Sequence, residues 1–195
     1  LKGIRPVVAK KRVKELIAKV GLSKVANKKM KKLSGGMKRR AGIAQAMLNN
    51  PKILILDEPT AGLDPNERIR FRNLISELSE DRLVLLSTHI VSDIEYIANE
   101  ILLMKDGKLM HKGTADEIIN SMTETVWECF VEKNMVSDFM KKYKISNMKS
   151  EADGVILRII SHEKPFVNAQ SVEASLEDVF LYYFGEKAGD ENAAL

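Results

Sequence analysis

The stretch 53-ILILDEPTAGLD-64 decides the fold class of this chain. It begins with four apolar residues, 53–56, a run typical of a buried strand that is covered on both faces. Asp57 and Glu58 follow directly, so two carboxylates lie where this strand ends. Ligands of α/β proteins bind at that edge of the sheet. The stretch therefore predicts an α/β fold with an acidic site at a strand end, although an Asp-Glu-Pro sequence can also simply end a strand.

A second apolar run, residues 83–86, follows after one predicted helix. Asp64 and Pro65 suit the N-cap and the first turn of that helix. Apolar residues then recur at helical spacing: Phe71, Leu74, Ile75 and Leu78. Strand, helix and strand together predict a βαβ unit whose two strands are parallel.

Upstream of the first strand, residues 6–20 have the apolar spacing of an amphipathic helix. A basic loop leads to Leu33-Ser34-Gly35-Gly36, which opens a second helix that ends near residue 50. A serine hydroxyl and glycine N–H groups at a helix N-terminus can hold an anion. Ser34, Gly35 and Gly36 are therefore candidate phosphate contacts, and an ordinary serine N-cap is the alternative.

Downstream, the pattern changes to short strands and helices. Asp106-Gly107 between two strand-like runs is a strong hairpin signal, and Thr114 and Glu117 form a capping box that opens a helix. Beyond residue 122 we predict strands over 125–132 and 155–161, with helices over 135–142 and after Ser175. We therefore expect a first domain over 1–121, a small α+β accessory domain over 122–185 and a disordered tail over 186–195.

Composition and charge limit the class of protein. Hydrophobic residues make up 45% and charged residues 30% of the chain, which excludes a disordered protein, and Cys129 is the single cysteine, so an intrachain disulfide is excluded. Residues 1–40 hold 15 lysines and arginines against one acidic residue, Glu15. Such a basic segment is either a solvated helical face or a contact with nucleic acid or a membrane surface. It contains no aromatic residue to stack on bases, which favours the first interpretation.

Three motifs carry a resemblance to a known family: LSGGMKRR at 33–40, ILILDEPTAGLD at 53–64 and LLSTH at 85–89. They resemble, in order and spacing, the nucleotide-binding domain of ATP-binding cassette (ABC) ATPases. The resemblance covers about residues 7–121. It implies the C-terminal part of a P-loop NTPase domain with a mainly parallel sheet, followed by the α+β appendage.

The same resemblance implies a role for each candidate residue. Glu58 would be the catalytic carboxylate and His89 the switch histidine that touches the terminal phosphate. Asp57 would hold Mg²⁺ directly or through water, and ATP would be the second cofactor. The residues expected to bind these cofactors are Ser34, Gly35, Gly36, Asp57 and Asp64, the last of which ends the D-loop.

One departure from the family is important. A P-loop has the form GxxxxGK followed by Ser or Thr, because its amides and lysine hold phosphates. The sole Gly-Lys pair in these 195 residues is Gly107-Lys108, which lies in the predicted hairpin. Both glutamines, Gln45 and Gln170, come after the signature motif, whereas the family's Q-loop glutamine precedes it. We therefore expect a C-terminal fragment, cut inside the helical subdomain, that is inactive alone.

The leading functional hypothesis is an ATPase subunit of an ABC-type exporter. Residues 175–181, SLEDVFL, resemble the C-terminal element of bacterial exporter ATPases for antibiotics and sodium. The resemblance implies a second ABC ATPase domain as partner in a head-to-tail dimer, and separate transmembrane permease subunits. It also implies a cytoplasmic protein that is peripheral on the inner face of the cell membrane.

Two alternatives remain at this stage. The first is a non-catalytic partner that lends its signature motif to an intact ATPase. The second is an ABC ATPase that acts on nucleic acid, which the basic segment motivates. No heptad coiled coil lies beside the signature motif and no second cassette is present in the sequence, so nucleic acid is not the expected partner.

Overall fold

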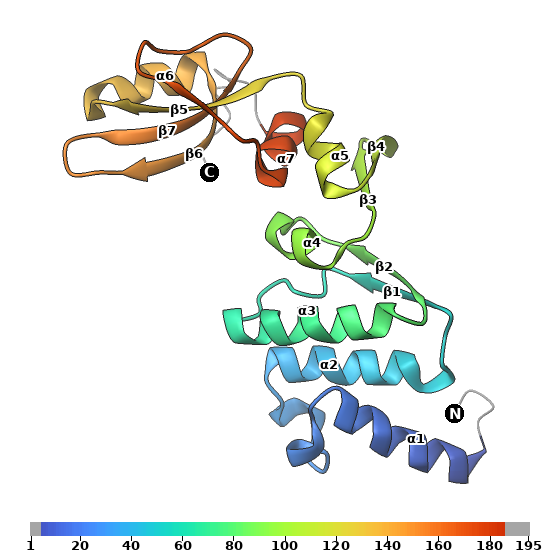
Figure 1. Ribbon diagram of the computed structural model, residues 1–195. Coiled ribbons are helices and arrows are strands. Elements are labelled where there is room, and N and C mark those ends of the chain that lie inside the picture. The colour runs from blue at the N-terminus through green and yellow to red at the C-terminus, as the bar shows by residue number, and fades with distance from the viewer. Residues whose placement is uncertain (1–4, 186–195) are drawn as a thin grey trace. The chain divides into compact units, whose positions relative to one another are not determined.

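The computed structural model describes residues 5–185, which Figure 1 draws in colour. The chain divides into two compact units, one ending at Ile97 and the other beginning at Ala98. The boundary expected after residue 121 therefore falls inside the second unit. The reason is that the hairpin and short helix before residue 121 belong to that unit, where the helix packs against the last helix of the chain. The tail expected at 186–195 lies outside the described residues.

The first unit is built from helices and one pair of strands. Its main elements are α1 (Pro6–Lys19), α2 (Gly35–Ala46), β1 (Ile53–Asp57), α3 (Pro65–Ser79), β2 (Leu83–Ser87) and α4 (Val91–Ile97). Short 3₁₀ turns lie at Ser23–Val25, Met30–Lys32 and Met47–Asn49. Figure 1 shows α2 between α1 and α3, with α3 beside the strands. β1 and β2 pair in parallel, with Asp57 opposite Ser87, so the expected βαβ unit is confirmed.

The helices of this unit begin where the sequence predicts. Pro6 occupies the first turn of α1, and Pro65 that of α3. The Asp64 side chain accepts a hydrogen bond from the Glu67 N–H at 2.9 Å, which caps α3. The Ser34 side chain caps α2 in the same way through the Met37 N–H at 3.3 Å. Such caps satisfy amides that have no partner inside the helix.

The core of the first unit lies on one side of the strand pair. Leu54 of β1 is 3% exposed and packs with buried residues of α3, including Phe71 and Leu78. The other face of the strands is open, because four large apolar side chains are 48–70% exposed: Ile53, Ile55, Leu83 and Leu85. The apolar runs are typical of strands that are covered on both faces, but within the described residues only one face of the pair is covered. Alternate strand residues point to opposite faces, and the helices of this unit bury only one of them.

The second unit is an antiparallel α+β structure. Its elements are β3 (Ile101–Lys105), β4 (Lys108–Gly113), α5 (Ala115–Asn120), β5 (Thr125–Val131), a 3₁₀ turn (Lys133–Met135), α6 (Val136–Lys142), β6 (Lys144–Ser150), β7 (Val155–Ser161), β8 (Gln170–Val172) and α7 (Leu176–Phe184). β3 and β4 form the expected hairpin, and Asp106 and Gly107 at its turn have φ of 51° and 73°. Positive φ at both positions is the geometry of a type I′ turn. The larger sheet has the order β6-β7-β5-β8, and all its pairs are antiparallel.

This larger sheet has its own core. Leu157 and Ile159 of β7 are fully buried and pack with Cys129 and with Phe139 of α6. Burial raises the pKa of the Cys129 thiol, which keeps it protonated. Parallel pairing is therefore confined, among the described strands, to β1 and β2 of the first unit.

A buried ion pair holds α7 in the second unit. The Arg158 guanidinium donates to the Asp178 carboxylate, with the shortest contact at 2.8 Å, and to Glu128 at 3.0 Å. Asp178 also completes the capping box that Ser175 opens, and the helix begins after Ser175 as the sequence predicts. Burial opposes ionisation of Asp178, but hydrogen bonds from Arg158, Ser146 and Ser175 outweigh it and lower the pKa of Asp178 to about 2.

Candidate functional site

The acidic site forms where β1 and β2 end side by side. Asp57 and Ser87 are opposite each other in the parallel register, and Ser87 Oγ donates to Asp57 Oδ1 at 2.5 Å. The next residue, Glu58, donates its N–H to the Ser87 carbonyl oxygen at 3.0 Å. The strand edge thus brings the two carboxylates of residues 57 and 58 together with a hydroxyl group, as expected for parallel neighbours.

Glu58 and His89 lie in direct contact. His89 Nδ1 is 2.9 Å from Glu58 Oε1, and Thr88 Oγ1 donates to Glu58 Oε2 at 3.4 Å. The side chain of His89 is 68% exposed and that of Glu58 is 38% exposed, so water reaches both groups. The pair therefore combines a carboxylate with an imidazole at the carboxyl edge of the sheet, where ligands of such folds bind.

The start of α2 offers hydrogen-bond donors to an anion. Ser34 is its N-cap, and the amides of the following first turn have no partner inside the helix. A Cβ atom placed on Gly35 would meet no atom within 4 Å, so this glycine leaves open space at the helix end. Gly36 is different, because a Cβ there would lie 2.6 Å from Glu67 Oε2. A side chain at position 36 would therefore displace the Glu67 carboxylate, whereas Gly35 leaves the helix end accessible.

A buried arginine explains this packing. Arg40 of α2 is 7% exposed and donates Nη1 to the carbonyl oxygen of Val20 at 3.0 Å, at the end of α1. Its Nη2 lies 3.1 Å from Glu67 Oε2, so the pair joins α2 to the first turn of α3. Asp64, the N-cap of α3, is three residues from Glu67. The helix starts at Ser34 and Asp64 are thus tied to one another through Arg40 and Glu67.

The sequence analysis assigned no role to several residues of the site. They are Arg39, Arg40, Glu67, Ser87 and Thr88. The signal for the first two is weak but present, because arginine at successive positions of one helix places one side chain inside and one at the edge. Glu67 follows Asp64 at the spacing of a capping box and was not singled out.

The donor set at the strand edge fits Mg²⁺ in chemical type. Mg²⁺ favours oxygen ligands and is commonly bound through one or two carboxylates, with waters and phosphate oxygens completing the octahedron. Asp57 supplies an exposed carboxylate with the Ser87 hydroxyl beside it. No group of three or more His, Cys, Asp or Glu residues suited to a metal occurs within residues 5–185. An ion held by Asp57 would therefore need its remaining ligands from water or phosphate.

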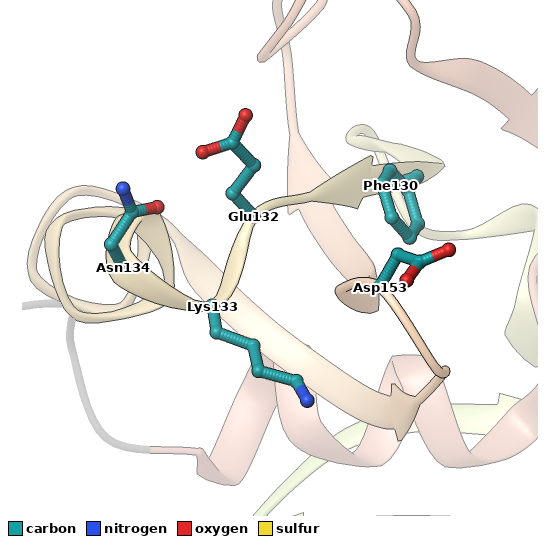
Figure 2. Close-up of a pocket in the computed structure, with 5 residues that line it drawn as sticks. All are labelled: Phe130, Glu132, Lys133, Asn134 and Asp153. Carbon is teal, nitrogen blue, oxygen red and sulfur yellow. The ribbon is translucent and has the colours of Figure 1, made fainter.

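The hollow drawn in Figure 2 lies elsewhere, in the second unit. It is lined by Phe130, Glu132, Lys133, Asn134 and Asp153. Figure 2 shows the carboxylate of Glu132 and the amine of Lys133 pointing away from each other. Their side chains do not converge on a common point, so this hollow has no arrangement for chemistry, and it contains none of the site residues predicted from the sequence.

Comparison with known proteins supports the same interpretation of the chain. The family model of the ABC transporter matches residues 4–61. YxlF of Bacillus subtilis, an uncharacterised ABC transporter ATP-binding protein, is 36% identical over 69% of this chain and 46% of its own length. YhcH of the same organism, described in the same words, is 31% identical over 92% of this chain and 62% of its own length.

A methionine import protein and a solved structure match as well. The methionine import ATP-binding protein MetN 2 of Oceanobacillus iheyensis is 35% identical over 76% of this chain and 44% of its own length. The structure of cbiO1 from Clostridium perfringens, part of the ABC transporter complex cbiONQ, is 30% identical with a TM-score of 0.56. That match covers 62% of this chain and 49% of cbiO1.

These matches and the strand-end site define a P-loop NTPase class of fold, within which the motifs are those of ABC ATPases. The chain belongs to the family of ABC transporter ATP-binding proteins, in which it corresponds to the nucleotide-binding domain. It spans about half the length of the curated relatives it matches. Within the described residues, no helix has the length and apolar character needed to cross a bilayer.

Proposed function

We propose that this chain is the ATP-binding and ATP-hydrolysing subunit of an ABC-type exporter, which couples hydrolysis to transport through separate membrane subunits. The observation that carries the proposal is the contact between Glu58 and His89 at the strand edge, 2.9 Å between Oε1 and Nδ1. A carboxylate with a hydrogen-bonded imidazole is suited to orient and deprotonate a water molecule.

In this proposal each residue of the site has a distinct task. Where a P-loop completes the site of these carboxylates, as in a full-length chain, Glu58 accepts the proton of the attacking water and His89 holds the carboxylate in place. Asp57 would hold Mg²⁺, which neutralises charge on the phosphates when bound. Ser34 and the open helix end at Gly35 bind phosphate oxygens through the hydroxyl and backbone N–H groups.

The nucleotide site is proposed to be shared between two chains in a head-to-tail dimer. In the family, each site takes the hydrogen-bond donors of the signature motif, where Ser34 lies in this chain, from one chain. It takes the P-loop, carboxylates and histidine from the other. These 195 residues contain no GxxxxGK[ST] sequence, so we expect them to bind ATP weakly and not to hydrolyse it alone. Their signature helix can still complete a site whose P-loop is supplied by a partner.

The export direction rests on the C-terminal element at Ser175–Leu181, which resembles that of bacterial antibiotic and sodium exporters. The relatives' names include an importer, MetN 2, so the direction needs its own test. Deleting the gene separates the two cases. Loss of an exporter lowers the tolerance of the cells to sodium or to an antibiotic, whereas loss of an importer lowers uptake of its substrate.

We propose a cytoplasmic location, peripheral on the inner face of the membrane, with permease subunits as partners. A non-catalytic partner of an intact ATPase is the second candidate, because the signature helix is complete while the sequence holds no P-loop motif. An ABC ATPase acting on nucleic acid has less support. A salt-dependent affinity for DNA or RNA at micromolar concentration or below would favour it.

Steady-state phosphate release from a mixed dimer tests the shared site. The chain is combined with a full-length, P-loop-containing relative such as YxlF. We expect Ser34→Arg in this chain to abolish the hydrolysis that exceeds that of the relative alone, because a bulky cation blocks the helix end. We expect Glu58→Gln in this chain to change little, since its own site has no P-loop to hold ATP.

Ser34→Ala is a control for Ser34→Arg, because it also removes the cap of α2 but places no bulky group at the helix end. A large loss of activity from Glu58→Gln would show that this chain's own site turns over, and the shared-site proposal would be wrong. A stable mixed dimer with no added hydrolysis, for the unchanged chain, would also contradict it.

A further inference from the structure

Among the described residues, one side-chain hydrogen bond links the helix that begins at Ser34 to the strand-end residue Glu58. Arg39 lies in α2, five residues after Ser34. Its Nη1 donates to the backbone carbonyl oxygen of Glu58 at 3.0 Å, and the bond is partly buried. Five residues of α-helix span about 7 Å, so one rigid turn and a half separates the phosphate-binding end of α2 from this contact.

The backbone of Glu58 needs such support. Its φ is 42°, in the left-handed region that residues other than glycine rarely adopt. Non-glycine residues persist there only where the surrounding structure holds them. The Glu58 N–H is bound to the Ser87 carbonyl, and its own carbonyl accepts from the Ala61 N–H at 3.4 Å. Arg39 supplies the shorter bond to that carbonyl.

The choice of acceptor also matters. A guanidinium this close to a glutamate commonly forms a bidentate pair with the carboxylate. Arg39 instead binds the backbone oxygen of Glu58, which leaves both carboxylate oxygens to His89 and Thr88. The arginine therefore fixes the peptide without competing for the group that faces solvent and the imidazole.

We propose that Arg39 is a positioning residue that holds the peptide of Glu58 in its left-handed conformation and links it to the phosphate-binding end of α2. Any effect of Arg39 on catalysis rests on the proposed function. In a shared-site dimer, Ser34 and Glu58 of one chain serve different nucleotides. Arg39 then ties the backbone of Glu58 to the helix whose end meets phosphate at Ser34.

Amide hydrogen exchange and NMR of the 195-residue chain test the positioning role without nucleotide. Arg39→Ala should raise the exchange rate of the Glu58 amide about tenfold, the size expected when one charge-assisted hydrogen bond is lost. The ring resonances of His89 should shift, because the carboxylate no longer points at Nδ1. Arg39→Lys keeps a charged donor. Its Glu58 exchange rate and His89 resonances should therefore lie between those of the unchanged chain and those of Arg39→Ala.

Lys38→Ala is the matched control, because Lys38 is the exposed neighbour of Arg39 on the same helix. It should leave Glu58 and His89 unchanged. Unchanged exchange at Glu58 in Arg39→Ala would show the proposal to be wrong. Faster exchange throughout α2 in that variant, including Ile43, would also overturn it, because the arginine would then stabilise the helix generally.

The link to Ser34 is tested separately. Ser34→Ala removes the cap of α2, and we expect it to shift the His89 ring resonances when Arg39 is present. In the Arg39→Ala background the same change should have no effect on His89. An equal shift in both backgrounds would show that the signal does not pass through Arg39. None of these measurements uses ATP, so their failure is distinct from failure of the proposed function.

Discussion

The two units of this chain cover the apolar side chains of their strands to different extents. In the second unit, α6 and the sheet enclose a core in which Leu157 and Ile159 of the central strand β7 are fully buried. In the first unit, the parallel pair buries Leu54 but leaves Ile55 70% exposed. Antiparallel strands joined by short turns can complete a sheet locally, whereas parallel strands need long connections and cover on both faces.

In both units, nevertheless, a mostly buried ion pair holds a helix in place. Arg40 and Glu67 join α2 to α3 in the first, and Arg158 and Asp178 hold α7 in the second. In each case one member of the pair has a second, more exposed partner. Glu67 also pairs with Arg70, and Arg158 also pairs with Glu128. This symmetry permits matched comparisons, because the buried and exposed partners of the same group can be removed separately.

The largest effect is expected in the first unit. Arg40→Met leaves Glu67 without its buried partner and frees the Val20 carbonyl, so the free energy of unfolding of this unit should fall by about 3 kcal/mol. Arg70→Met removes the exposed partner of the same Glu67 and should cost less than about 1 kcal/mol. Urea unfolding followed by circular dichroism measures both. If both variants lost the same free energy of unfolding, burial of the arginine would not determine how much its ion pair with Glu67 stabilises the unit.

A smaller effect is expected in the second unit. Asp178→Asn should lower its free energy of unfolding by about 2 kcal/mol at pH 7, since a pKa lowered from 3.8 to about 2 corresponds to roughly that energy. The folded pKa is depressed, so the stability is present above the ordinary pKa and is lost as the pH falls from about 5 towards 2. The fluorescence of Trp127, the single tryptophan, reports this unit.

Glu128→Gln is the control for this prediction, because Glu128 is the more exposed partner of Arg158. It should cost less than about 1 kcal/mol and leave the acid dependence in place. If Asp178→Asn retains the same loss of stability between pH 5 and pH 2, another carboxylate causes it.

The smallest effect on stability is expected at the open face of the strand pair. Ile55→Thr should change the free energy of unfolding by about 0.5 kcal/mol or less, because the side chain is already in contact with solvent. It should reduce aggregation and the binding of a hydrophobic dye, which an exposed apolar sheet face promotes. Leu54→Ala, on the covered face, should cost about 3 kcal/mol. Equal costs would mean that the Ile55 face is also covered in solution.

The sequence predicts most elements of both units, because their signals are local. Asp64-Pro65, Thr114 with Glu117, and Asp106-Gly107 each satisfy backbone groups within three or four residues. Strands β6 and β8 were missed. Lys144–Ser150 has little apolar alternation and a register shift after Ile145, and Gln170–Val172 has three residues. Both become strands only by pairing with β7 and β5.

For the candidate site, the sequence by itself determined which residue types stand at the strand ends and at the start of α2. Asp57, Glu58 and His89 follow from apolar runs and their polar successors, and Ser34 follows from its glycines. It could not determine that Glu58 contacts His89 or that Arg39 binds the Glu58 carbonyl, because these bonds join residues 31 and 19 positions apart. Tertiary packing decided them. The parallel register of β1 and β2 places Glu58 near His89, and the buried Arg40–Glu67 pair joins α2 to α3. Neither contact of Glu58 is encoded in a local sequence pattern, because its partners are distant in the chain.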